Sequence, residues 1–211
     1  MGTPYVIEQG DTLSFIAGAC GMTWKALYDH PENAAFRRTH PDPNKIRVGD
    51  IIMLPGLVAG HYEVPGMKLI AQQDSMACWY ASAQMLVKWK EETAQQSFAN
   101  LMSPEFDAEC RRLRDAGGGI LNPAIMAMAK RLGLVPVPPM TPTPGTIQKW
   151  LEQYGPLWVN GKTHIVVIAG IRGLKVKVYD PWPVNKGTID WRSLRDWYVG
   201  GKNPVAGVDS S

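Results

Sequence analysis

Hydrophobic and polar positions in the first quarter of the chain form a short β pattern, two helical patterns and a second β pattern. An apolar run at 5–7 predicts a strand. Apolar residues with helical spacing follow twice, first after Asp11 or Thr12 and then after Thr23, and polar residues of these types are typical helix N-caps. An apolar run at 51–54 stops at a proline and predicts a closing strand. The pattern predicts a small module built as strand, helix, helix, strand.

The pattern changes from helical to β along the remainder of the chain. Helical spacing predicts helices at 74–93, 121–132 and 146–154, and apolar runs predict strands at 157–159, 164–171 and 175–179. Helices that precede antiparallel strands are typical of an α+β domain. A stretch with two glycines and no clear period separates the two parts. We therefore predict an N-terminal module at 1–56, a linker at 57–64 and a larger domain at 65–211.

Composition and charge narrow the range of partners. The net charge is only +3 and no dense run of Lys and Arg occurs, so nucleic acid is not expected as a partner. Three widely spaced cysteines fit neither a disulfide framework nor a paired metal motif. There is no apolar stretch of about 18 residues and no signal-peptide pattern at the N-terminus. We expect a soluble protein without a membrane span that is exported by a specialised secretion system and acts in a target cell.

One of the three cysteines has the surroundings of a nucleophile. Cys78 follows Asp74 and Ser75, either of which can cap the helix predicted at 74–93. The positive end of a helix dipole and the free N–H groups of its first turn favour a thiolate, which is the reactive form of cysteine. Acyl transfer also needs a donor for the developing oxyanion. Gln72, six positions before Cys78, is a candidate, with Gln73 as a less favoured competitor.

A histidine and an aspartate further along the chain complete this chemistry. His164 precedes the apolar run 165–170, which predicts a rigid central strand. The next predicted strand ends at Asp180, and a hairpin around Gly173 would bring Asp180 beside His164. Asp180 would then fix the tautomer of the imidazole and stabilise the imidazolium.

The order of these residues resembles that of papain-like cysteine proteases of the compact bacterial kind. Gln72 comes first, Cys78-Trp79 opens a helix, His164 precedes an apolar strand, and Asp180-Pro181 ends the next strand. The nearest relatives look like papain-like effector proteases and the bacteriocin-leader peptidases that cut after paired glycines, and the resemblance covers about residues 65 to 200.

The resemblance implies a role for each of these residues. It implies a papain-like domain with a catalytic N-terminal helix and an antiparallel sheet, in which Cys78 is the nucleophile, His164 the general base and acid, Asp180 the orienting residue and Gln72 the oxyanion donor. Plant-type papains carry Asn in place of this Asp, so their substrate preferences are not carried over. Two tryptophans beside these positions are expected to bind substrate, Trp79 and Trp182.

The N-terminal module carries a second resemblance, to LysM modules. The matching residues are Tyr5-Val6, Gly10-Asp11-Thr12-Leu13, Ile16-Ala17, Asn44, Ile46, Gly49-Asp50-Ile51 and Leu54-Pro55. The family implies a βααβ fold that binds N-acetylglucosamine polymers such as peptidoglycan. Its two groove loops place the glycan contacts at Gly10, Asp11, Thr12, Leu13 and Ile46. The basic insert at 37–40 departs from the commonest pattern and resembles longer modules, for which docking is the alternative to sugar binding.

Together these features predict a cysteine endopeptidase with a Cys-His-Asp triad. We expect an exported antibacterial or host-directed effector toxin, with a protein or peptide substrate, peptidoglycan contact or loading through the LysM module, and a cognate immunity protein. No metal or organic cofactor is expected, because thiol and imidazole supply both nucleophile and proton transfer. Two alternatives remain, a peptidoglycan peptidase or amidase and a catalytically inactive wall-binding protein.

Overall fold

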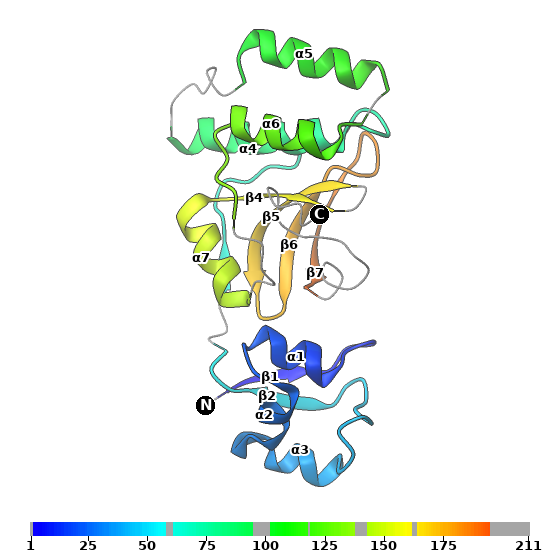
Figure 1. The fold of residues 1–211 in the computed structure, drawn as a ribbon, viewed down its shortest axis with the longest axis vertical. Coiled ribbons are helices and arrows are strands. Elements are labelled where there is room, and N and C mark those ends of the chain that lie inside the picture. The colour runs from blue at the N-terminus through cyan, green and yellow to red at the C-terminus, as the bar shows by residue number, and fades with distance from the viewer. Residues whose placement is uncertain are drawn as a thin grey trace.

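The computed structural model describes residues 2–57, 61–94, 102–117, 119–137, 143–161 and 164–194. These residues form a small N-terminal module and a larger α+β domain that contact each other end to end (Figure 1). Each part has its own cluster of buried apolar side chains. Among the described residues, no helix is both long and apolar enough to cross a membrane.

The N-terminal module packs three short helices against a two-stranded antiparallel sheet. Thr12 and Thr23 are the N-caps of the first two helices, and each hydroxyl accepts a hydrogen bond from the backbone N–H three residues later. The elements are β1 (Thr3–Val6), α1 (Leu13–Ala19), α2 (Trp24–Asp29), a 3₁₀ turn (Pro31–Asn33), α3 (Ala34–Thr39) and β2 (Ile51–Leu54).

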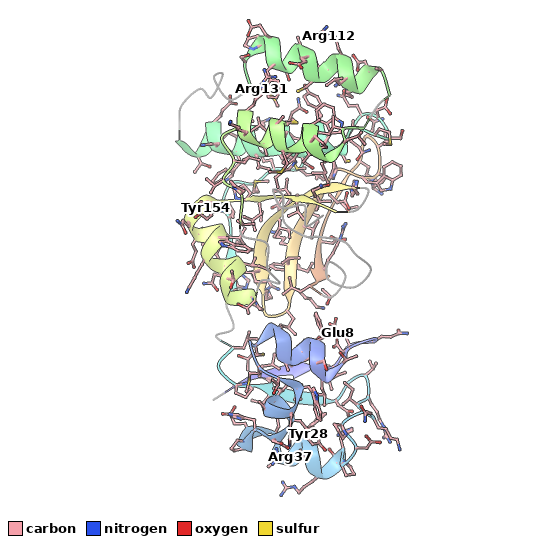
Figure 2. The ribbon with its side chains drawn as sticks, in the orientation of Figure 1. Glu8, Tyr28, Arg37, Arg112, Arg131 and Tyr154 are labelled. Atoms are coloured by element: carbon pink, nitrogen blue, oxygen red, sulfur yellow. The ribbon has the colours of Figure 1, made fainter. Side chains whose placement is uncertain are left out.

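The third helix was not expected from the apolar pattern, which predicted a loop in the basic insert. Phe36 lies on the inner face of α3 and is buried in the core of the module. Arg37 donates from Nη1 to the backbone oxygens of Tyr28 and His30, and Figure 2 shows Arg37 beside Tyr28. Asn33, which is fully buried, bonds to the backbone of both α2 and β2. One aromatic side chain and these long-range bonds therefore give a βαααβ module in place of the expected βααβ order.

The larger domain is a five-stranded antiparallel sheet with helices at one end and along one side (Figure 1). Strand β5 is central and buried, with β6 on one edge, followed by β7, while β3 and β4 pair with different halves of its other edge. The elements are β3 (His61–Glu63), α4 (Cys78–Ala94), α5 (Pro104–Asp115), α6 (Asn122–Arg131), α7 (Pro144–Tyr154), β4 (Leu157–Asn160), β5 (Ile165–Arg172), β6 (Lys175–Asp180) and β7 (Thr188–Ser193).

The segment predicted as a linker is largely part of the two folded units. Leu57 lies in the core of the N-terminal module. His61–Glu63 forms β3, and Val64 is buried in the core of the larger domain. Pairing with β5 recruits 61–63 into the sheet, although the sequence of this segment has no strand pattern of its own.

The hydrophobic pattern of the sequence did not predict α5 and β7, because few of their residues are buried. Helix α5 buries only Phe106 and Cys110. It is attached to α6 through Arg131, which lies over the ring of Phe106 and forms an ion pair with Glu109 at 3.0 Å (Figure 2). Strand β7 is half-exposed along its length, so it lacks the apolar alternation that reveals a strand.

The turn of the β5–β6 hairpin joins the two units. Leu174 in this turn is 3% exposed and belongs to the apolar cluster of the N-terminal module. Phe15 of α1 packs against the clusters of both units. Beside this contact, Lys175 Nζ lies 2.6 Å from Glu8 Oε1, and Figure 2 places Glu8 at the junction. The contact between the two units therefore lies at the turn of this hairpin.

Truncation of this apolar contact is expected to destabilise the junction. Leu174→Ala should lower the free energy of unfolding by about 3 kcal/mol, because a buried leucine loses its transfer energy and leaves a cavity. Leu113→Ala, at a leucine that is 47% exposed, is the matched control and should cost less than about 1 kcal/mol. Chemical denaturation measures both values. Equal small losses would show that the N-terminal module does not cover Leu174 in solution.

Candidate active site

Cys78 is the first residue of α4, the helix that packs against the central strand β5. The first N–H groups of a helix have no acceptor within it, so the N–H of Cys78 is free of intrahelical bonds. Ser82, fully buried one turn later, donates from Oγ to the backbone oxygen of Ile165 at 3.1 Å. This bond fixes the start of α4 against the start of β5, and His164 is the residue immediately before β5.

The pairing of β5 with β6 contains a bulge at Ala169. Ile168 lies opposite Val178. Gly170, two residues further along, lies opposite Lys177, the direct neighbour of Val178. Ala169 is therefore an extra residue on β5 without a partner on β6, as in a β-bulge.

This bulge determines the face of the sheet on which Asp180 lies. Val167 pairs with Tyr179, and continuation of that register by one residue sets Asp180 opposite Val166. Opposite residues share a face, as do residues two apart on one strand, so Asp180 lies on the same face as His164. Without the extra residue, Asp180 would lie opposite Val167, and its side chain would leave the face of His164.

The imidazole of His164 is held between the other two candidate residues. Its Nε2 lies 2.6 Å from Oδ1 of Asp180. The side chain of Cys78 also interacts with the imidazole and raises the pKa of His164. Since Asp180 occupies Nε2, Nδ1 is the ring nitrogen left for the sulfur. The backbone oxygen of His164 accepts from the N–H of Gly161 at 2.8 Å, which fixes the position of the residue before the strand begins.

The charges at this site favour a protonated imidazole. Burial by itself lowers the pKa of His164, but hydrogen bonds to Asp180 and Cys78 and the charges of both raise it from 6.5 to about 9. Burial by itself raises the pKa of Asp180, but bonds from His164, from the Trp182 N–H and from Arg192 hold it below its usual value. At neutral pH the site therefore contains an imidazolium beside a carboxylate.

Both carboxylate oxygens of Asp180 are engaged. The backbone N–H of Trp182 donates to Oδ1 at 2.9 Å, and Arg192 Nη2 lies 2.8 Å from Oδ2. Sequence reasoning missed Arg192, because β7 has no clear strand pattern and an arginine twelve residues from its partner gives no local signal. Only the pairing of β6 with β7 brings Arg192 to Asp180.

The side chain of Gln72 is directed at the loop before Cys78. It is buried, and its Nε2 donates to the backbone oxygens of Asp74 at 2.6 Å and Ser75 at 3.0 Å. An amide nitrogen carries two hydrogens, so both are in use. A bond to an oxyanion would require one of these hydrogens to leave its carbonyl, and the role of Gln72 as oxyanion donor stays a prediction.

The backbone of Gln72 connects the two loops that carry the candidate site. Its N–H donates to the oxygen of Pro181 at 3.0 Å, and its oxygen accepts from the N–H of Asn185 at 2.8 Å. The segment before Cys78 is therefore hydrogen-bonded to the segment that follows Asp180.

The two tryptophans predicted to bind substrate have different environments. Trp79 is 2% exposed and lies in the core of the larger domain, so its position is that of a packing residue and not of the expected groove wall. This burial fits the helical spacing of the segment, which sets Trp79 on the apolar face of α4 that packs on the sheet. Trp182 is 49% exposed next to Asp180 and is available to a substrate.

Comparison with protein families agrees with this geometry. The family model described as "Papain-like cysteine protease AvrRpt2" matches residues 58–196, about two thirds of the chain. The chain belongs to this family. It is therefore a cysteine peptidase, and the predicted papain-like fold is confirmed. The LysM domain model matches residues 5–30, which confirms the second predicted resemblance. No curated protein and no solved structure was found to match.

The LysM module of this peptidase has a groove of about 280 Å³ at the start of α1. Four of the five predicted glycan contacts line it, and Gly10 does not. The groove also includes Trp24, which is 42% exposed and which the sequence comparison did not single out. The lining residues are Asp11, Thr12, Leu13, Ser14, Trp24, Pro43, Asn44 and Ile46. An exposed aromatic ring among polar side chains suits a ligand with both apolar and hydroxyl-bearing faces.

The other two cysteines of the peptidase have thiols whose pKa values are raised. Burial raises the pKa of Cys20 to about 11. Burial and the charges of Glu109 and Asp107 raise the pKa of Cys110 to about 11. Thiols with such values are protonated and unreactive at neutral pH. Within the described ranges, no three His, Cys, Asp or Glu side chains converge as a metal site.

The titration of His164 provides a direct check of the pair with Asp180. NMR should give a midpoint near pH 9, and Asp180→Asn should lower it towards 6.5, because the neutral amide cannot stabilise the imidazolium. The protonated form is the one stabilised in the folded state. Its contribution to stability is therefore complete below pH 6.5 and is lost as the pH rises through 9. A wild-type midpoint near 6.5 would contradict the pairing.

Proposed function

We propose that the protein is an endopeptidase that acts through a triad of Cys78, His164 and Asp180. The observation that supports the proposal is the position of His164, whose Nε2 lies 2.6 Å from Asp180 Oδ1 and whose pKa is raised by Asp180 and by the neighbouring side chain of Cys78. A nucleophile, a base within reach of it and a third group that orients the base form the constellation needed for acyl transfer.

In the proposed reaction, the sulfur of Cys78 attacks the carbonyl carbon of the scissile bond. The C–S bond forms, and the carbonyl oxygen becomes an oxyanion. The imidazolium of His164 then gives its proton to the leaving amine as the C–N bond breaks, which leaves a thioester on Cys78. The neutral imidazole next takes a proton from water, whose oxygen attacks the thioester; the C–S bond breaks, the carboxylic acid is released, and the thiolate of Cys78 is left beside the imidazolium. Asp180 holds the imidazole in one tautomer throughout.

The proposed oxyanion site begins with the N–H of Cys78, because a donor at the first turn of a helix has no competing acceptor within the helix. We assign the second donor to the side-chain amide of Gln72. Its two present acceptors are backbone oxygens of the loop that leads to Cys78, so movement of that loop on substrate binding would free one hydrogen. Trp182 is proposed as the exposed wall of the substrate groove.

The LysM module is proposed to hold the enzyme at glycan polymers of a cell wall or to assist its loading. We further propose that the peptidase is exported and acts as a toxin on proteins of a target cell, bacterial or host, and that a cognate immunity protein covers its cleft in the producing cell. The combination of a peptidase half and a wall-binding half in one chain supports this proposal.

The target class is tested by exposing purified enzyme to a lysate of candidate target cells and, separately, to purified sacculi. New protein N-termini are expected in the lysate with wild-type enzyme, and their number should fall at least about 1,000-fold with Cys78→Ala, since removal of the nucleophile leaves only binding and oxyanion stabilisation. Mass spectrometry of the termini measures this. Cys110→Ala is the matched control and should keep the cleavage pattern.

The alternative of a wall hydrolase has support from the LysM groove, which lies in the same chain as the thiol site. Release of muropeptides from sacculi that depends on Cys78, without new protein termini, would replace the proposed substrate by peptidoglycan. Absence of both products with folded protein whose Cys78 thiol is reduced would favour the inactive wall-binding protein.

Glycan binding is expected to depend on the exposed ring in the groove. Trp24→Ala should weaken binding to soluble N-acetylglucosamine oligomers by about tenfold, because the loss of an aromatic contact costs about 1–2 kcal/mol. Ile51→Ala changes an exposed apolar side chain of the same module outside the groove and should leave the affinity unchanged. Calorimetric titration measures both. Equal affinities of the two variants would place the glycan elsewhere or favour a docking role.

A further inference from the structure

We propose that Arg192 is a positioning residue of the peptidase, which holds Asp180 charged and correctly oriented for His164. The inference rests on the proposed function of the triad. The guanidinium of Arg192 contacts Asp180 and Asp190, so its action on the imidazole would pass through the carboxylate of Asp180.

The contacts of Asp180 separate its two oxygens by role. Oδ1 receives the imidazole of His164 and the backbone N–H of Trp182. Oδ2 faces the guanidinium of Arg192 at 2.8 Å. With a bond on each oxygen, rotation of the carboxylate about its own axis would break at least two contacts at once. Arg192 therefore fixes the orientation of the carboxylate plane of Asp180 from the side opposite to the imidazole.

Arg192 is itself held by a second carboxylate. Its Nε donates to Oδ1 of Asp190 at 2.8 Å while Nη2 reaches Asp180. A guanidinium presents several donors in a rigid plane, so it can bridge two carboxylates in a way that the point charge of a lysine cannot. Asp190 and Arg192 both lie on β7, two positions apart and therefore on the same face of the strand.

Burial strengthens the electrostatic interaction between Arg192 and Asp180. The side chain of Asp180 is 9% exposed and that of Arg192 is 26% exposed, so solvent screens the pair less than it would a surface ion pair. The charged and titratable groups around Asp180 are His164 before β5, Cys78 on α4 through that imidazole, and Arg192 with Asp190 on β7. Arg192 is the cation of this set that does not depend on pH near neutrality.

This arrangement has a consequence for activity in acid. Loss of the guanidinium would let Asp180 take up a proton at a higher pH, because one of the bonds that hold its pKa low would be gone. A protonated Asp180 no longer stabilises the imidazolium beside Cys78. The acidic limit of thiol reactivity should therefore move upward, which a change of general stability alone would not cause.

The experiment compares Arg192→Gln with wild type in two measurements. The first is the rate at which iodoacetamide alkylates Cys78 as a function of pH, followed by mass spectrometry of the Cys78 peptide. The acidic limb of this pH–rate profile should move up by about one pH unit in Arg192→Gln. At a fixed pH on that limb, the alkylation rate should therefore be about tenfold lower than in wild type. The second is the NMR titration of the Asp180 side-chain carbon, assigned with Asp180→Asn, whose midpoint should rise.

Three further variants separate charge from structure. Arg192→Lys restores the positive charge and should recover most of the shift, and a lysine variant as impaired as the glutamine variant would overturn the electrostatic role. Asp190→Asn perturbs the second contact of Arg192 but keeps the cation beside Asp180, and it should not move the limb upward. Arg172→Gln removes an arginine of the same sheet that contacts Glu63 and should match wild type. If Arg192→Gln does not fold, the lysine and asparagine variants carry the comparison.

The outcomes also distinguish this inference from the proposed function. If wild-type Cys78 reacts no faster than the same cysteine in the denatured chain, the proposed catalysis fails. A raised Asp180 midpoint in Arg192→Gln would then still support the positioning of Asp180. If Cys78 is reactive and neither the limb nor the Asp180 midpoint moves in Arg192→Gln, Arg192 has no positioning role and the inference is overturned.

Discussion

The extra residue in β5 is the constraint on which the candidate site depends. Side chains alternate between the faces of a sheet, so a shift of one residue in the pairing of β5 and β6 exchanges the face of every residue beyond it. Ala169 introduces such a shift between the hairpin turn and the site. It sets Asp180 on the face of His164, at the distance at which a carboxylate and an imidazole share a hydrogen bond. Gly170, beside the bulge, is closely surrounded: an added Cβ would lie 3.0 Å from Lys177 Cβ, so the neighbouring strands would have to shift to admit a side chain.

The surroundings of this pair are built from backbone bonds and from long-range charges. Gln72 joins the loop before Cys78 to the loop after Asp180 through its N–H and its oxygen. Gly187 lies against the same region, where an added Cβ would come within 2.9 Å of the backbone oxygen of Asp180. These contacts hold two separate segments of the chain together at one end of the sheet. The amide nitrogen of Gln72 and the carboxylate of Asp180 each have specific partners, which is what a fixed orientation of charged groups requires.

The β5–β6 hairpin also relates the site to the LysM module. Its closed end, at Leu174, is covered by the module, and its open end carries His164 and Asp180. The peptidase domain and the module are therefore in contact through the turn of this hairpin. A glycan held in the LysM groove and a substrate at the thiol site would accordingly be bound by two surfaces with a defined relative position.

Local signals in the sequence determined the elements with strong periodicity and the residues with distinctive chemistry. The caps at Thr12 and Thr23, the buried strand β5 and the order of Cys78, His164 and Asp180 could all be read from the chain, because each depends on neighbours within a few positions or on residue type. Tertiary structure decided the rest. Elements α3, α5, β3 and β7 are stabilised by contacts with distant segments, so their own patterns are weak. The bulge and the approach of Arg192 to Asp180 likewise depend on which strands become neighbours, and a linear sequence does not display that information.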